Sequence, residues 1–274
     1  MTALQLSPIG IISSCYKEKF GIPRQPSLVP AAMAELVLGD EFGEESVRGL
    51  EGFSHIWINF VFHETQAQGW KPMVRPPRLG GNEKVGVFAS RSTFRPNPLG
   101  LSVIELLGVE TKSGKVVLHL AGCDLMDGTP VLDIKPYLPY ADIIPNAKGG
   151  FAETKPEALL EVVFSEEAEA QCKQADRRID HVALHKIQQS LKKLTSCHSK
   201  VGGCALKQDN RYDLKVLIIQ ILQLDPRPSY QQRHQSKNKG DNESDRIYAM
   251  KLHDFDLKWR YCDNNKIKVI ALAN

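Results

Sequence analysis

Short apolar runs, separated by Gly, Pro and Asn, dominate the first half of the chain. They predict seven strands, over residues 7–13, 35–38, 54–63, 84–90, 101–107, 115–120 and 130–136. Most of these runs follow one another without a helical pattern between them, which argues against the alternating strands and helices of a doubly wound nucleotide-binding fold. Gly114 stands between two runs and predicts a hairpin turn. We therefore expect a mainly β N-terminal domain, an antiparallel β-barrel-like sheet over residues 1–147.

The pattern becomes helical after about residue 148. Ser165 is followed by acidic residues, as is typical of an N-cap and a first helical turn, and the helix is predicted to continue toward Leu194. A second helix is expected over residues 212–224, because prolines follow at once and end it.

The last part of the chain predicts strands again. Residues 247–260 and 266–272 have the pattern of a closing hairpin around an Asp-Asn-Asn turn. Residues 231–245, which precede this hairpin, are polar and lack hydrophobic anchors, so they predict a mobile loop. With the two helices, these strands indicate a smaller α+β accessory domain over residues 148–274.

Composition and charge narrow the class of protein. The chain of 274 residues is 42% hydrophobic and 24% charged, as soluble globular proteins are. Its net charge of +3 is too small to imply non-specific nucleic-acid binding, although it allows a local basic patch. The sequence contains no apolar run long enough for a membrane span, and its first residues do not resemble a signal peptide. We therefore expect a cytoplasmic protein.

The cysteines do not form a recognisable metal or disulfide pattern. In a chain without an export signal we expect free thiols at all six positions, Cys15, Cys123, Cys172, Cys197, Cys204 and Cys262. Cys197, His198 and Cys204 are zinc-ligand types, but a fourth ligand at a fitting spacing is missing. His181 and His185 stand four residues apart, but no Glu follows the first. We expect no bound metal.

A proline-locked loop between two predicted strands, residues 90–100, is the strongest candidate for a functional site. Pro96 and Pro98 fix two φ angles and restrict the residues before them. The stiff loop presents groups that recognise carboxylates, phosphates and base edges: Arg91, Arg95 and Asn97. The alternative is an ordinary proline-rich connection whose arginines lie in water.

Other polar segments stand at predicted strand ends, and none contains a familiar phosphate-binding or serine-hydrolase motif. They include residues 19–27, the pair His63 and Glu64, and the basic residues 75–82. The strand that precedes His63 is apolar at nearly every position, which predicts burial on both faces. A lone His is usually structural, so only its place beside other polar loops makes it a candidate.

The segment 122–137 adds carboxylates and a cation. Asp133 and Lys135 are two residues apart in a predicted strand and therefore share a face. They form either a surface ion pair that contributes little to stability or a pair of groups for a polar ligand. Together, the polar segments suit a ligand with a carboxylate, an amine and hydroxyls.

Several of these segments resemble the TsaA/TrmO family. The resemblance covers the N-terminal half and depends on residues 16–20, 23–26, 47–51, 53–57, 75–82, 91–98 and 127–137. The C-terminal half is similar to bacterial members through residues 225–230 and 252–255. Residues 172–210 and 231–245 depart from the family pattern, which puts tRNA preference in doubt more than the chemistry.

The resemblance implies an S-adenosylmethionine-dependent tRNA methyltransferase with a β-barrel catalytic domain. Family members act as homodimers on the N6 nitrogen of threonylcarbamoyladenosine, next to the anticodon of certain threonine tRNAs. The implied cofactor-binding residues are Gln25, Pro26, Ser27, His63, Glu64, Arg91, Leu101, Gly122, Cys123 and Asp124.

Methyl transfer to a weakly nucleophilic N6 favours a nearby proton acceptor, for which Glu64 and Asp133 are the candidates. Arg91 and Arg95 are candidates for cofactor or substrate carboxylates, and the substrate-binding candidates are Arg95, Asn97 and Lys135. Local cations for gripping tRNA include Lys192, Lys193, Arg227 and Lys258. The alternatives are a non-catalytic RNA-binding or regulatory barrel and a methyltransferase with another substrate.

Overall fold

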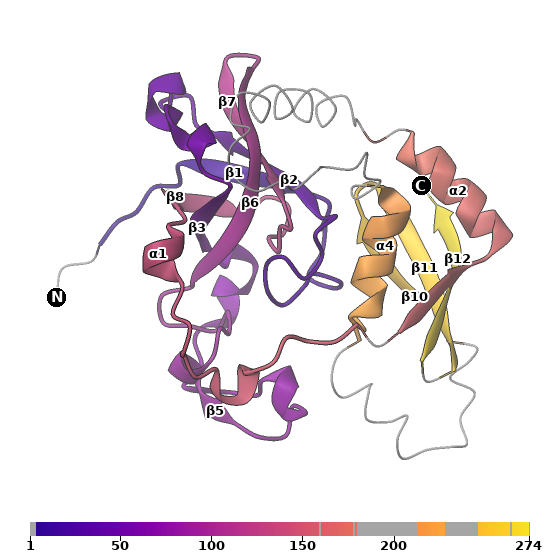
Figure 1. The fold of residues 1–274 in the computed structure, drawn as a ribbon. Coiled ribbons are helices and arrows are strands. Elements are labelled where there is room, and N and C mark those ends of the chain that lie inside the picture. The colour runs from indigo at the N-terminus through magenta and orange to yellow at the C-terminus, as the bar shows by residue number, and fades with distance from the viewer. Residues whose placement is uncertain are drawn as a thin grey trace.

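The computed structural model describes residues 4–158, 160–177, 179, 213–227, 246–263 and 265–273. Its N-terminal half is a closed antiparallel barrel with the strand order β1-β2-β7-β6-β3-β8, which confirms the predicted fold class (Figure 1). The barrel strands are β1 (Gly10–Ser14), β2 (Met33–Leu38), β3 (His55–Val61), β6 (Leu99–Lys112), β7 (Lys115–Ala121) and β8 (Pro130–Pro136). No helix in these ranges is both long and apolar enough to span a membrane.

Side chains alternate between the two faces of each strand, and the inward-facing side chains fill the barrel. In β3, Ile56, Ile58 and Phe60 point inward and are buried, while the residues between them are only half-buried. The prediction that this strand is buried on both faces is therefore wrong: its outer residues include the polar His55 and Asn59 and lie at a partly open surface. A barrel this small has room inside for side chains alone, so a ligand must bind at its rim or outside.

The β6–β7 hairpin forms where the glycine predicted it. Ser113 and Gly114 have φ angles of 53° and 80°, the left-handed pair that a tight two-residue hairpin turn requires. Glycine reaches this region without steric cost, which makes the signal readable from sequence.

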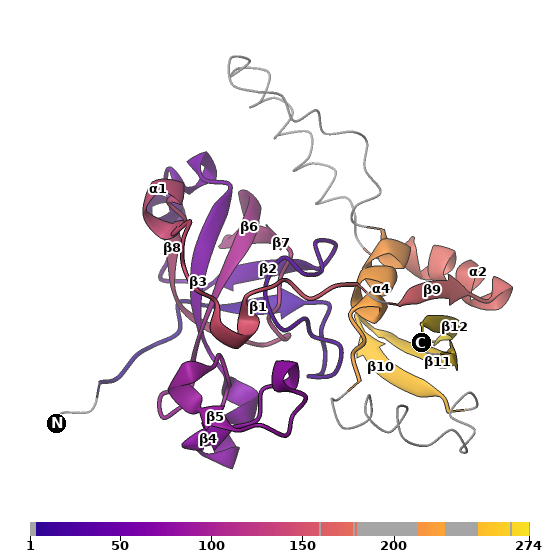
Figure 2. The ribbon, with the colours of Figure 1, turned by 60° about the horizontal axis from the view of Figure 1, so that its bottom comes forward.

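Residues 84–90 do not form the predicted barrel strand. Only Val85–Gly86 (β5) is extended, and it pairs with Met73–Val74 (β4) in a separate two-stranded sheet. Val87–Ala89 then turns as a 3-10 helix (η5), because Val87 is buried and its N–H donates to the carbonyl of Pro72 at 3.0 Å. Figure 2 shows β4 and β5 in a lobe that extends below the barrel.

Short helices complete the N-terminal half. The α-helix α1 (Pro139–Asp142) follows the barrel, and Asp142 accepts a hydrogen bond from the indole N–H of Trp57 at 3.0 Å. The 3-10 helices are η1 (Glu44–Val47), η2 (Leu50–Gly52), η3 (His63–Gln68), η4 (Pro77–Leu79) and η6 (Gly150–Ala152).

The C-terminal half is a four-stranded sheet with helices, as the α+β prediction required. Its strand order is β10-β11-β12-β9, and β9 is parallel to β12. The elements are β9 (Glu161–Phe164), α2 (Glu166–Asp176), α4 (Leu214–Gln223), β10 (Tyr248–Leu252), β11 (Phe255–Asp263) and β12 (Lys266–Ala273).

Two predicted boundaries in this half are wrong. The run 247–260 contains two strands, because His253 adopts a φ of 53° and turns the chain without a glycine. The first helix begins as predicted, with Ser165 Oγ accepting from the N–H of Ala168 at 3.1 Å, but α2 ends at Asp176. The rest of its predicted range toward Leu194 and the predicted loop 231–245 lie outside the described residues.

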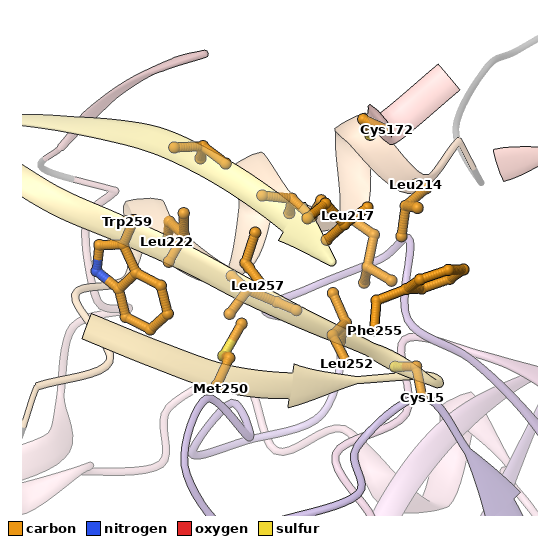
Figure 3. Packing of buried hydrophobic residues seen from close by; sticks show 14 of the residues in the cluster. Cys15, Cys172, Leu214, Leu217, Leu222, Met250, Leu252, Phe255, Leu257 and Trp259 are labelled. Carbon is orange, nitrogen blue, oxygen red and sulfur yellow. The ribbon is translucent and has the colours of Figure 1, made fainter. Parts of the chain in front are cut away.

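The two halves share a hydrophobic core through the segment that joins β1 to β2, residues 15–32, called here the connecting segment. Phe20 stacks on Trp259 with ring centroids 5.9 Å apart, and Tyr16 forms a β-bridge with Leu252. Figure 3 shows Cys15 beside Leu252. The backbone of this segment is also held by the C-terminal half, because Ala31 N–H donates to Gln220 Oε1 at 2.9 Å.

Candidate functional site

The connecting segment meets the chain after β7 at a close backbone crossing. The N–H of Ser27 donates to the carbonyl of Gly122 at 2.9 Å. Gly122 has a φ of 68°, and a side chain there would have its Cβ 3.3 Å from Ser27 Cα. A glycine is therefore required for conformation and for space. This contact joins two of the segments that the resemblance assigns to cofactor binding.

Gln25 brings the proline-locked loop to the same place. Its Oε1 accepts a hydrogen bond from Arg91 Nη1 at 2.5 Å, and its Nε2 donates to the carbonyl of Arg24 at 2.5 Å. Pro26 stands between Gln25 and Ser27 and restricts the backbone of this turn. The guanidinium of Arg91 is thus oriented at the junction of three segments, although the residue is exposed.

Asp124 is the most perturbed carboxyl group of the site. Burial raises its pKa from 3.8 to about 6, against the opposing effects of a hydrogen bond with Ser102 and the positive charge of Arg91. Its Oδ1 is buried and has no hydrogen-bond partner among the described residues. Buried polar atoms are almost always hydrogen-bonded, so this oxygen marks a place for a donor that the described residues do not supply.

Cys123 holds the segment around Asp124 in the barrel core. The Cys123 side chain is fully buried, its backbone N–H donates to the carbonyl of Ala32 at 3.1 Å, and Leu125 is buried on the other side of Asp124. Burial raises the pKa of the Cys123 thiol well above its usual value. Cys123 is thus a packed, protonated side chain that anchors the carboxylate next to it, not a reactive group.

His63 and Glu64 begin η3 at the end of β3, and Lys19 joins them to the connecting segment. Lys19 Nζ donates to the Glu64 carbonyl at 3.0 Å and lies 3.6 Å from its carboxylate. His63 Nε2 is 3.9 Å from Glu64 Oε1. The Phe62 N–H donates to the carbonyl of Pro98, which ties η3 to the proline-locked loop at 2.8 Å.

Leu101 and Asp133 lie on the outer surface of the barrel. Asn59 in β3 is paired with Leu101 on one side and with Asp133 on the other. Two strand spacings separate the last two residues, or roughly 10 Å. Leu101 is 51% exposed, which is unusual for leucine in a central strand. Lys135 contacts the Asp133 carboxylate, as the shared face predicted.

Arg95 and Asn97 do not share the contacts of Arg91 with Gln25: their hydrogen bonds are made within the proline-locked loop and with η5. Arg95 Nη1 donates to the carbonyls of Val87 and Ser90 at 3.2 and 2.8 Å and so fastens the proline-locked loop to η5. The Asn97 carbonyl accepts from the N–H of Leu99 at 2.7 Å, and the residue is exposed. Substrate binding by these two residues and by Lys135 stays a prediction.

These contacts join Gln25 to Arg91, Ser27 to Gly122 and Arg91 to Asp124, and they form a patch beside the barrel to which Lys19 ties Glu64. Leu101 lies on the outer face of β6 and is not joined to the patch by these contacts. Sequence reasoning missed Ser102 as part of this patch, and it included Lys19 only as the first residue of the polar segment 19–27, without a partner. Ser102 is a polar residue at an inward position of β6 and is only 3% exposed, a signal that was readable once the strand had been assigned. The pairing of Lys19 with Glu64 has no comparable signal, because the two residues are 45 positions apart in the chain.

The patch contains a buried carboxylate, an oriented guanidinium, backbone groups and a half-buried imidazole. These groups suit a small molecule that carries an ammonium group, a carboxylate and hydroxyls. No group of three or more His, Cys, Asp or Glu side chains that could hold a metal occurs in the described ranges. The zinc candidates Cys197, His198 and Cys204, and the pair His181 and His185, lie outside those ranges.

Comparison with known proteins identifies the family. Residues 11–143 match the family model of the tRNA-methyltransferase O N-terminal domain, and residues 197–274 match that of the TrmO C-terminal domain. A tRNA (adenine(37)-N6)-methyltransferase of Escherichia coli K12 is 43% identical over 264 residues, which are 96% of this chain and 95% of that protein. The chain belongs to the TrmO family of tRNA methyltransferases.

Other TrmO relatives agree over the whole length. A Pseudomonas aeruginosa protein with S-adenosylmethionine-dependent methyltransferase in its name is 40% identical over 98% of this chain and 97% of its own. A crystal structure of TrmO from Pseudomonas aeruginosa aligns with a TM-score of 0.70 and 35% identity, and it covers 100% of both chains. The predicted family, the methyltransferase class and the barrel fold are thus confirmed.

Proposed function

We propose that this chain transfers a methyl group from S-adenosylmethionine to the N6 nitrogen of threonylcarbamoyladenosine at position 37 of threonine tRNA. Full-length similarity to a tRNA (adenine(37)-N6)-methyltransferase supports the position and the atom. The single structural observation that carries the proposal is the buried Asp124 carboxylate with an unpartnered Oδ1, held beside Arg91 among the described residues. The family resemblance supports homodimeric assembly and a cytoplasmic location as parts of the same proposal.

The residues of the patch fit S-adenosylmethionine by their chemistry. Asp124 Oδ1 lacks a donor within the described residues, and an ammonium group would supply one. Arg91 is oriented by Gln25 and has further N–H groups available for a carboxylate. The Gly122 backbone leaves no side chain in the way of a ligand at the crossing with Ser27. When bound, S-adenosylmethionine supplies an electrophilic methyl group on a sulfonium centre.

The chain's own contribution to the reaction is positioning and proton removal. The neutral thioether leaves without protonation, so the patch needs no general acid. We assign proton acceptance from N6 to Glu64, because Lys19 ties its backbone to the connecting segment that also carries Gln25. Asp133 is the weaker candidate, because it lies on the outer face of the barrel, away from the contact that joins Glu64 to the connecting segment.

A matched pair of variants tests this assignment. Glu64→Gln keeps size and polarity but removes the proton acceptor, and we expect a 10²- to 10⁴-fold lower single-turnover rate, the usual contribution of a general base. Asp133→Asn should keep the rate within about twofold. Unchanged rates in both variants would show that neither carboxylate accepts the proton.

The proposed function itself is tested in an Escherichia coli strain that lacks its tRNA (adenine(37)-N6)-methyltransferase. Expression of this chain should restore the N6-methylated form of threonylcarbamoyladenosine, measured by nucleoside mass spectrometry of isolated threonine tRNA. An Asp124→Ala variant produced at the same level serves as the inactive control. A chain that binds tRNA but not S-adenosylmethionine in calorimetry would instead be the non-catalytic RNA-binding module.

A further inference from the structure

The β4–β5 lobe, residues 69–98, has a larger net positive charge than the whole chain. It contains six Lys and Arg and one Glu, so its formal net charge is +5, whereas that of the whole chain is +3. The remainder of the chain is therefore slightly acidic. No ion pair that involves a lobe cation occurs in the described part of the chain. Unneutralised cations concentrated in one lobe are the electrostatic feature that a polyanion recognises.

The backbone of the lobe is held in place by contacts within the lobe and by one contact with the segment near η6. Lys71 N–H donates to the Phe94 carbonyl at 3.1 Å, and Lys71 Nζ lies 4.1 Å from the centroid of the Phe94 ring. Arg95 fastens η5 to the proline-locked loop. Arg78 donates to the carbonyl of Thr154, near η6. The exposed side chains of the lobe are therefore presented on a fixed backbone.

Phe88 is the most exposed aromatic side chain of the lobe, ahead of Trp70, which is 56% exposed. Its side chain is 75% exposed, although its neighbour Val87 is 1% exposed and anchors the turn. The Arg95 guanidinium lies 5.6 Å from the Phe88 ring centroid. An exposed ring with a guanidinium beside it is available to stack on a planar ligand group, which exposure alone would not indicate. Because Arg91 is only three residues further on and contacts Gln25, Phe88 stands at the edge of the candidate site.

The lobe also extends toward the C-terminal half through a second pair of cations. Burial lowers the pKa of Arg24, and the positive charge of Arg78 lowers it further, while Asp225 acts in the opposite direction. Arg24 and Arg78 are thus close enough to repel each other. In contrast, the predicted tRNA contact Arg227 is wrong, because the side chain is 3% exposed and its Nε and Nη2 bind Asp225 at 2.8 and 2.7 Å. Lys192 and Lys193 lie outside the described residues.

We propose that the β4–β5 lobe is the surface that holds the anticodon stem-loop of tRNA, with Phe88 stacking on an unpaired base and the exposed cations Arg75 and Lys84 contacting phosphates. This inference rests on the proposed function for the identity of the RNA. Proteins recognise single-stranded loops by stacking bases on aromatic side chains beside cations. A second copy of the lobe is disfavoured as the occupant, because two surfaces of charge +5 would repel each other.

The test measures the affinity of the full-length protein for unmodified threonine tRNA transcript by fluorescence anisotropy at several salt concentrations. Phe88→Ala and Phe88→Leu should each weaken binding about tenfold, and Phe88→Tyr should keep wild-type affinity, since one base–aromatic stack is lost only in the first two. Combining Arg75→Ala with Lys84→Ala should lower the slope of log affinity against log salt by 1 to 2, because about two phosphate contacts are removed.

Matched controls come from exposed residues outside the lobe. Tyr140→Ala removes an aromatic side chain that is 87% exposed on α1, and Lys112→Ala removes a cation at the β6–β7 hairpin. Both should leave affinity and salt slope unchanged. Equal losses in the control and lobe variants would contradict the proposed location.

The remaining outcomes separate this inference from the proposed function. Affinity within twofold of wild type for Phe88→Ala would overturn the stacking surface. If Phe88→Ala changed the sedimentation coefficient and left tRNA affinity unaltered, Phe88 would be a contact between protein molecules, and the stacking surface would again be overturned. If Phe88→Ala loses tRNA affinity but the wild-type protein transfers no methyl group, the tRNA-binding role of the lobe is supported and the proposed function is contradicted. If the wild-type protein binds no tRNA, the lobe inference falls.

Discussion

The buried carboxylate of Asp124 should make the protein without ligand less stable at neutral pH than it would be with a neutral side chain. Its pKa is raised from 3.8 to about 6 in the folded state. A shift of roughly 2 units corresponds to about 3 kcal/mol of destabilisation above pH 6. A binding site that keeps a desolvated carboxylate trades stability for recognition of a ligand donor.

The sign of the pH dependence follows from proton binding. Between pH 4 and 6 the folded state retains a proton on Asp124 that the unfolded state has lost, so this group makes stability fall as pH rises through that window. Integration from pH 5 to pH 8 gives a loss of about 1.4 kcal/mol from this group. Asp124→Asn has the same shape and no titration, so this component should vanish in the variant.

The assay compares the free energy of unfolding of wild type and Asp124→Asn by urea denaturation at pH 5 and pH 8, without ligand. The advantage of the variant over wild type should grow by about 1.4 kcal/mol between these two pH values. A constant cost from burying the new amide N–H₂ does not affect this difference. Asp133→Asn, a change at the outer surface of the barrel, should show no such growth. A pH-independent difference for Asp124→Asn would refute the reasoning.

Three further outcomes follow from the site and its supports. Arg91→Ala should weaken S-adenosylmethionine binding in calorimetry at least tenfold yet change the free energy of unfolding by less than about 0.5 kcal/mol, because the residue is exposed; a loss of stability with intact binding would assign Arg91 to the fold. Gly122→Ala should destabilise the protein by about 1–2 kcal/mol, since it combines a φ of 68° with a 3.3 Å approach to Ser27. Burial raises the pKa of the Cys15 thiol to about 12, so iodoacetamide at pH 8 should label exposed Cys262 and leave Cys15 unmodified in mass spectrometry of the native protein.

The barrel was predictable because its strands carry local signals. Alternating apolar residues mark the inward face of β3, and Gly114 marks the β6–β7 turn. The sequence predicted β5 as a barrel strand because a short apolar run does not determine which strand it pairs with. The turn at His253 carried no Gly or Pro signal, so β10 and β11 read as a single run.

The candidate site was predictable as a set of segments but not as an arrangement. Family resemblance supplied the positions around Gln25, Arg91 and Asp124, and the structure shows which of them touch. The raised pKa of Asp124 comes from its burial in the folded chain, which sequence spacing cannot express. The shared core of the connecting segment is likewise non-local, since Phe20 and Trp259 meet from opposite ends of the chain.

The most direct test of the proposed function is methyl transfer by the purified full-length protein. Threonine tRNA that carries threonylcarbamoyladenosine at position 37, and the same transcript with unmodified adenosine, are each incubated with methyl-labelled S-adenosylmethionine. We predict that label enters the first tRNA alone, in one nucleoside whose mass increases by a methyl group on N6. Label in both tRNAs, or in neither while the protein binds the cofactor, would contradict the proposed substrate.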